Sequence, residues 1–143
     1  MRTPSILARS QDWPERLAAF IDARRYTPFA WGTNDCAMLA ADAVLELTGM
    51  DPAAQYRGAY ATEDQADGMI SAAGGLEALS DSLAAAAGLG SCMPAFAQRG
   101  DLVLVEHGNI RALGVVTGDA VAVPGPDGLA FLPVRAAVRA WSV

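Results

Sequence analysis

The central helical pattern of the chain begins at Cys36. Apolar residues recur from this position at intervals of three and four residues: Cys36, Leu39, Ala40, Ala43, Val44 and Leu47. Acidic residues fall on the opposite side, so the spacing predicts an amphipathic helix from Cys36 to Thr48. A side-chain oxygen of Asn34 or Asp35 can cap the first turn, and Gly49 can end the helix in the left-handed conformation.

Three further segments have helical spacing. The first covers residues 13–25 and begins with Asp12 and Glu15, which are spaced as a capping box. The second covers residues 62–72 and is ended by two consecutive glycines. The third covers residues 76–87 and carries leucines at positions 76, 79 and 83.

From Arg99 onward the period of the pattern changes. Short apolar runs separated by turn residues predict four strands, over residues 102–105, 112–117, 120–123 and 129–132. A turn at residues 107–110 joins the first two strands, which makes them antiparallel neighbours. The closing residues 133–141 predict a helical turn or a short helix. Helices followed by a small antiparallel sheet indicate the α+β class.

The composition narrows the classes of protein to which the chain can belong. Its 143 residues, 52% of them hydrophobic, predict one domain over residues 1–143 that buries about two thirds of its unfolded surface. No apolar run approaches the length of a membrane-spanning helix, and the N-terminus lacks the apolar core of a secretory signal. The net charge of −6, with no basic cluster beyond Arg24-Arg25, argues against a nucleic-acid partner.

The chain has two cysteines, Cys36 and Cys92, which is too few for a disulfide framework or a metal cluster. We therefore expect no metal, no cofactor, and a reducing compartment during folding. Cys36 lies at the positive end of a predicted helix dipole, which favours the thiolate and lowers the thiol pKa. The alternative interpretation is a buried structural cysteine, because Cys36 also lies on the apolar side of its own helix.

A thiol nucleophile also needs a base that carries a proton to the leaving group. His107 is the single histidine of the chain, and it lies in the predicted turn at residues 107–110. It reaches Cys36 only if this turn folds over the start of the helix, whereas side chains in such turns are commonly exposed. Asp35 suits a helix cap or a backbone clamp better than a base. The aromatic segment 26–34, which includes Trp31, either lines a groove or covers the end of the core.

The stretch Trp31-Gly32 followed by Asp35-Cys36 resembles the nucleophile region of the NlpC-type cell-wall cysteine peptidases, which have a papain-like fold. Gly100-Asp101-Leu102-Val103 resembles one strand of that family, and Leu113-Gly114-Val115-Val116 resembles the next. The resemblance implies a papain-like core with Cys36 as the nucleophile and with Trp31 and Asp35 in a binding role. It also implies a catalytic histidine just before the glycine and aliphatic pair, but the residue at that position is Ala112.

The chain is still more similar to a family of proteins encoded among the tail genes of phages and phage-like gene transfer agents, distant relatives of the NlpC peptidases. The similarity covers about residues 13–143 and rests on the order of short motifs. These are the Trp-Gly-x-x-Asp-Cys stretch, Thr48-Gly49-x-Asp51-Pro52, Arg57-Gly58-x-Tyr60, the Gly-Asp strand, Ala112 to Val116, Gly125 to Leu129 and Ala140-Trp141. The similarity implies a virion tail protein, assembled in the host cytoplasm and bound to other tail proteins at the tail tip or baseplate hub.

Three function classes remain open at this point. The first is a structural tail component, not an enzyme, whose papain-like fold has lost its catalytic histidine. The second is an active cysteine peptidase that uses Cys36 and His107 to cleave peptidoglycan and to assist tail penetration. The third is a small binding domain that uses a groove at Trp31 for a glycan or a peptide. Alanine at position 112 favours the first class.

Overall fold

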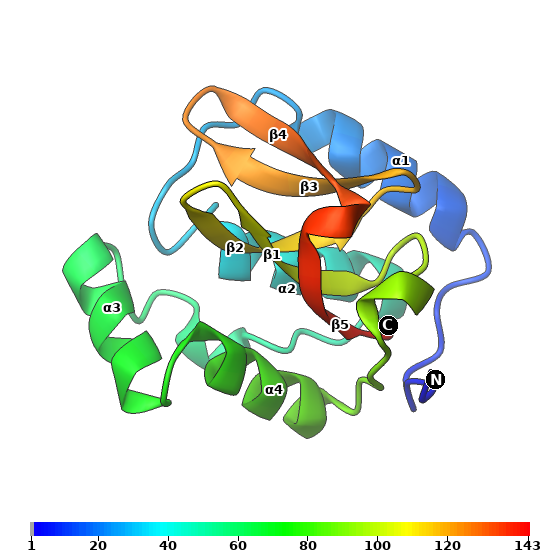
Figure 1. Cartoon of the computed structure of the whole chain (residues 1–143), viewed down its shortest axis with the longest axis horizontal. Coiled ribbons are helices and arrows are strands. Elements are labelled where there is room, and N and C mark those ends of the chain that lie inside the picture. The colour runs from blue at the N-terminus through cyan, green and yellow to red at the C-terminus, as the bar shows by residue number, and fades with distance from the viewer. Residues whose placement is uncertain (1) are drawn as a thin grey trace.

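The computed structural model describes residues 2–143 and shows, within them, four α-helices followed by a five-stranded antiparallel sheet (Figure 1). The helices are α1 Trp13–Arg24, α2 Cys36–Thr48, α3 Glu63–Ala72 and α4 Leu76–Ala87. The strands are β1 Leu102–His107, β2 Ile110–Val116, β3 Ala120–Gly125, β4 Gly128–Pro133 and β5 Ala137–Trp141. Three single-turn 3-10 helices cover Ala54–Tyr56, Pro94–Phe96 and Val134–Ala136. The predicted α+β class is confirmed, and no helix within residues 2–143 is both long and apolar enough to cross a membrane.

Both ends of α2 are set by the residues predicted from the sequence. Asp35 is the N-cap, and its Oδ1 accepts a hydrogen bond of 2.9 Å from the backbone N–H of Met38. Gly49 ends the helix with φ of 80°, in the left-handed region. The capping box expected at the start of α1 is wrong, because Asp12 makes no side-chain cap. Its carboxylate instead accepts a hydrogen bond of 2.8 Å from Arg16 one turn later.

The sheet has the strand order β4-β3-β2-β1-β5, and each strand is antiparallel to its neighbours. The predicted pairing of β1 with β2 is confirmed, with Leu104 opposite Leu113. The helical prediction for residues 133–141 is wrong beyond one short turn, since residues 137–141 form β5. The free edge of β1 explains the difference: Val103 pairs with Ala140, so the chain gains ladder hydrogen bonds that a helix would forgo.

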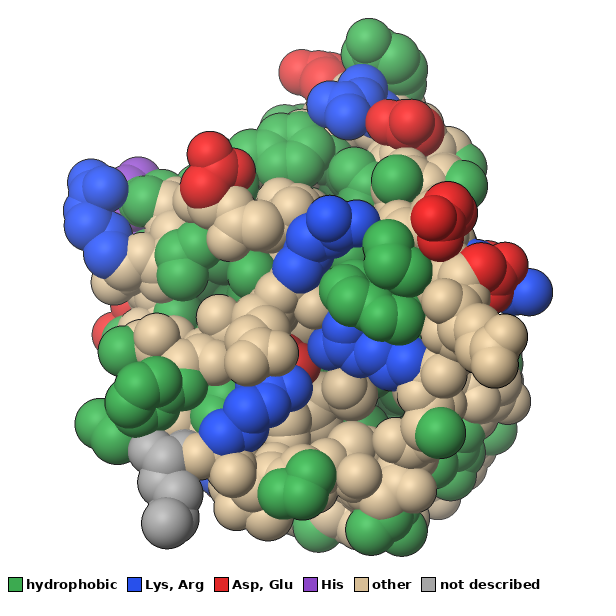
Figure 2. Space-filling model, turned by 90° about the vertical axis from the view of Figure 1, so that its right-hand side faces the viewer, with side chains coloured by type: hydrophobic (Ala, Val, Ile, Leu, Met, Phe, Trp, Pro, Cys, Tyr) green, Lys and Arg blue, Asp and Glu red, His purple; other side chains and the backbone are tan. Residues whose placement is uncertain are grey.

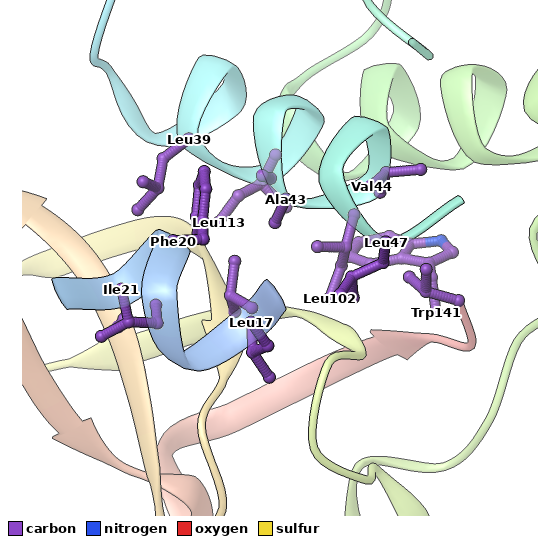
Figure 3. Packing of buried hydrophobic residues seen from close by; sticks show 14 of the residues in the cluster. Leu17, Phe20, Ile21, Leu39, Ala43, Val44, Leu47, Leu102, Leu113 and Trp141 are labelled. Carbon is purple, nitrogen blue, oxygen red and sulfur yellow. The ribbon is translucent and has the colours of Figure 1, made fainter. Parts of the chain in front are cut away.

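The two faces of the sheet belong to separate apolar clusters. Leu102, Leu104, Leu113 and Val115 pack on the side of α1 and α2. Figure 3 shows side chains of both helices meeting those of Leu102, Leu113 and Trp141. The alternate residues of β1 and β2 point to the other face of the sheet: Val103, Val105, Ala112 and Val116. They form the second cluster together with apolar side chains of β3, β4 and β5. This alternation decides which side chains of β1 and β2 face α2.

The α3–α4 pair lies below the sheet in Figure 1, and ion pairs join α4 to the sheet. Asp81 of α4 accepts hydrogen bonds of 2.8 Å from Arg139 and from the indole N–H of Trp141. Glu77 lies 3.6 Å from a guanidinium nitrogen of Arg111. These contacts are at the partly exposed rim of α4, and its apolar side faces α2.

The two ends of the chain meet at Asp101, a fully buried carboxylate just before β1. Its Oδ1 accepts hydrogen bonds of 3.0 Å from Arg2, 3.1 Å from Arg9 and 3.1 Å from the backbone N–H of Val143. Its Oδ2 accepts a hydrogen bond of 2.8 Å from the backbone N–H of Gln98. Figure 2 looks onto this side of the molecule and shows several arginine side chains gathered around apolar ones. The aspartate of the Gly-Asp motif therefore ties the two termini to the sheet.

Candidate functional site

The loop before α2 is held by the carboxylate of Asp35. While Oδ1 caps the helix, Oδ2 accepts hydrogen bonds of 2.8 Å from the backbone N–H of Gly32 and 2.5 Å from the hydroxyl of Tyr60. The residue is only 3% exposed, and its carboxylate is occupied by three donors. The expected cap and backbone clamp is confirmed. We call Gly32, Asp35 and Tyr60 the Asp35 clamp.

Position 32 must be glycine because the backbone there lies very close to the backbone at Tyr60. Its φ is 81°, and a Cβ at this position would lie 2.1 Å from the carbonyl oxygen of Tyr60. Any side chain would therefore push the segment at Tyr60 away and pull its hydroxyl from Asp35. This explains the Trp-Gly pair of the motif as a structural requirement of the clamp.

The aromatic segment before the clamp is fixed by Asn34. Its side-chain amide donates hydrogen bonds of 3.3 and 3.0 Å to the carbonyl oxygens of Thr27 and Pro28. This places the rings of Phe29 and Trp31 edge to face, with their centroids 4.7 Å apart. Trp31 is half-buried and lines a hollow beside α2, so its ring both covers the core and borders a cavity.

Cys36 lies in the first turn of α2 and packs against the cluster that contains Leu113 of β2. Burial raises the pKa of its thiol to about 11, and the negative charge of Asp35 acts in the same direction. A backbone hydrogen bond from Leu113 opposes this rise but does not cancel it. The expectation of a lowered thiol pKa is therefore wrong, because loss of hydration outweighs the helix dipole.

His107 does not lie near this thiol. It is exposed and ends β1 on the side of Val103 and Val105, away from α2. Glu106 pairs with Arg111, which in turn reaches Glu77 of α4, so the Glu106 side chain lies on the helical side of the sheet. Because side chains alternate along a strand, the next residue, His107, points to the opposite face. Leu104 lies opposite Leu113, whose backbone bonds to Cys36, and His107 is three residues beyond Leu104, or about 10 Å along the strand. The structure thus does not bring together the two residues expected to act as nucleophile and base.

Ala112 is also on the face of the sheet that points away from α2. It packs in the second cluster, with Val105 opposite it on β1. A histidine at position 112 would direct its ring into that cluster, not toward Cys36. The side chain of β2 that shares a cavity wall with Cys36 is that of Leu113, which is 6% exposed. The position that the resemblance assigns to a catalytic histidine therefore does not face the thiol in this chain.

A cavity of about 100 Å³ lies beside Cys36 and Trp31, between α2 and the α3–α4 pair. Its walls are almost entirely apolar and include the leucines of α4, Leu76, Leu79 and Leu83. None of these three side chains is fully buried, and the cavity that they border is partly open to solvent.

Sequence reasoning missed Tyr60 and the helices that pack beside Cys36. Tyr60 belongs to the Arg57-Gly58-x-Tyr60 motif, but nothing in that motif indicates that its hydroxyl bonds to the residue that caps α2. Within residues 2–143, no group of three or more histidine, cysteine, aspartate or glutamate side chains is arranged to hold a metal ion. The arrangement around Cys36 holds a neutral thiol in an apolar wall.

A comparison with protein families matched residues 8–143 to a family described as a domain of unknown function (DUF6950). Comparisons with curated proteins and with solved structures found no match. Because the matched segment spans nearly the whole chain, the protein belongs to the DUF6950 family.

Proposed function

We propose that the chain is a non-catalytic structural component of a phage-type tail, at the tail tip or baseplate hub, built on a degenerate papain-like core. The observation that carries the non-catalytic part is the environment of Cys36. Its thiol pKa is about 11, and the single histidine of the chain lies on the opposite face of the sheet.

The raised pKa of the Cys36 thiol and the absence of a nearby imidazole both act against thiol catalysis. With a pKa of about 11, roughly one Cys36 thiol in ten thousand is ionised at pH 7. Loss of a general base costs a further factor of about 10²–10⁴. Asp35 cannot replace that base, because its carboxylate is occupied by the cap and the clamp.

The motif residues shared with the tail-gene family support a structural role. Arg57 bonds to Asp51 of the neighbouring motif at 2.6 Å and lies 2.6 Å from Asp42 of α2. Three residues later, Tyr60 completes the Asp35 clamp. These motif side chains hold the segment after α2 against the loop before it, so stability accounts for their role without catalysis.

An exposed apolar surface supports a protein partner. Met93 and Phe96, at the Pro94–Phe96 turn, are 59% and 51% exposed, and Val138 of the adjacent strand β5 is 47% exposed. β5 is the last strand of the sheet on this side, and its outer side pairs with Cys92 through an isolated bridge at Ala140. We assign this surface to contacts with other tail proteins, in an interface of at least about 1,000 Å².

The test is the composition of purified particles. Quantitative mass spectrometry should find the chain in fixed stoichiometry with the tail-tip proteins. Phe96→Glu should lower its incorporation without lowering its Tm. Tyr26→Glu is the matched control, because Tyr26 is 82% exposed on the loop after α1 and should tolerate the same charge. A chain absent from particles that cleaves peptidoglycan in a Cys36-dependent way would favour the peptidase instead.

A further inference from the structure

The cavity beside Cys36 has walls that are almost entirely apolar. Asp35 reaches it, but three donors already occupy that carboxylate. Ser80 also reaches it, but the Ser80 hydroxyl donates a hydrogen bond of 2.7 Å to the carbonyl oxygen of Leu76. Among residues 2–143, no buried side-chain nitrogen or oxygen lacks a partner. A molecule that enters this space therefore meets mainly apolar side chains, which favours a neutral hydrocarbon group.

The volume limits the size of that molecule. An apolar cavity of about 150 Å³ stays dry and accepts benzene or xenon. The cavity here has a volume of about 100 Å³, which is too small for a long acyl chain. We propose that it is a binding site for a small neutral hydrocarbon group of about four to six carbon atoms, either one aromatic ring or a branched alkyl group.

The α3–α4 pair is built to open as the cover of this site. Gly74 and Gly75 join the two helices with φ of 95° and 117°, which gives the joint the freedom of two glycines. The rim of α4 is held by partly exposed ion pairs, including Arg111 with Glu77, and such pairs contribute little individually. A ligand can therefore enter between α4 and α2 without breaking the core around Leu39 and Leu47.

The experiment uses benzene as the probe and the full chain as the protein. Saturation at about ten times Kd should raise the folding equilibrium constant about tenfold, which is a rise in Tm of about 4 °C. Benzene should also slow alkylation of Cys36 several-fold, because that residue lines the cavity. Alkylation of Cys92, which lies in the second cluster, should not change.

A matched pair of variants separates cavity binding from a general solvent effect. Ala84→Leu places a larger side chain in the cavity wall, whereas Ala85→Leu makes the same change on the exposed side of α4. Benzene should stabilise Ala85→Leu as it does the native chain, and should not stabilise Ala84→Leu. If Ala84→Leu does not fold, Ala66→Leu on the α3 side of the cavity replaces it. The proposal is overturned if benzene changes neither the Tm nor the Cys36 alkylation rate of the native chain, or stabilises the filled variant equally.

Discussion

The hydroxyl of Tyr60 donates a hydrogen bond of 2.5 Å to the carboxylate of Asp35, although the two residues are 25 positions apart in the sequence. This contact joins the segment after α2 to the residue that caps α2. Burial raises the pKa of Tyr60, and the bond to Asp35 adds to that rise, so the hydroxyl remains a donor at neutral pH. The start of α2, and with it Cys36, is therefore positioned by a contact that no local pattern specifies.

Removal of the Tyr60 hydroxyl should destabilise the fold. Tyr60→Phe leaves the buried Asp35 carboxylate without its strongest donor, and we expect the free energy of unfolding to fall by about 1.5–3 kcal/mol. Tyr56→Phe is the matched control, because Tyr56 lines the same cavity without a bond to Asp35. Urea denaturation of both variants measures the difference, and equal losses would show that the clamp contributes nothing.

Gly32 should tolerate substitution far less well than Gly58. Both residues have positive φ, 81° and 75°, so Gly32→Ala and Gly58→Ala carry similar backbone strain. At Gly32 the new Cβ meets the Tyr60 carbonyl, whereas at Gly58 it meets nothing within 4 Å. Gly32→Ala should therefore cost about 1–3 kcal/mol more in denaturant unfolding. A smaller loss at position 32 than at position 58 would contradict the close approach.

Alkylation of Cys36 should depend on pH as expected for a thiol with a pKa of about 11. In a Cys92→Ala background, labelling should be slow at pH 7 and should rise with pH toward a midpoint near 11. A midpoint below the ordinary value of 9.0 would show that the helix dipole outweighs burial.

The raised pKa of Cys36 also makes the stability of the fold depend on pH at alkaline values. The pKa of Cys36 is higher in the folded chain than its ordinary value of 9.0, so the folded state binds the proton more tightly. This contribution is fully present below about pH 9 and is lost as the pH rises toward 11. Cys36→Ala should therefore show a shallower fall in the free energy of unfolding across this window. Identical slopes for the two chains would contradict the burial of the thiol.

Asp101 should be the most sensitive carboxylate in the fold. Asp101→Asn leaves the guanidinium groups of Arg2 and Arg9 without their buried partner, and we expect a loss of about 3–5 kcal/mol. Asp22→Asn is the control, because its pair with Arg25 is mostly exposed and should contribute less than about 0.5 kcal/mol. Thermal unfolding of the two variants provides the comparison.

Local sequence patterns were sufficient for the elements whose ends are fixed by their own residues. The 3.6-residue spacing, the cap at Asp35 and the left-handed Gly49 set the bounds of α2 from its own residues, although the Tyr60 contact positions its start. β5 was missed because residues 137–141 become a strand only through the edge of β1, which is a tertiary contact. The capping box at Asp12 was wrongly predicted for a similar reason. Its carboxylate accepts a hydrogen bond from Arg16 and does not cap the helix.

The position of Cys36 was predictable, but its chemistry was not. Its pKa depends on burial by elements that follow it in the chain, including Leu113 and the α3–α4 pair. The direction of His107 was hidden for a related reason. Both faces of the sheet are covered, so residues 102–105 are all buried and no alternation marks the side that faces α2.

Peptidoglycan hydrolysis tests the central claim most directly. The purified native chain, Cys36→Ser and His107→Ala should be incubated separately with purified cell-wall fragments, beside an active cell-wall hydrolase, and the soluble peptides released should be measured. Because the thiol is neutral and no imidazole faces it, we predict no release above the buffer blank by any of the three chains. Release by the native chain that is lost in Cys36→Ser would contradict the account.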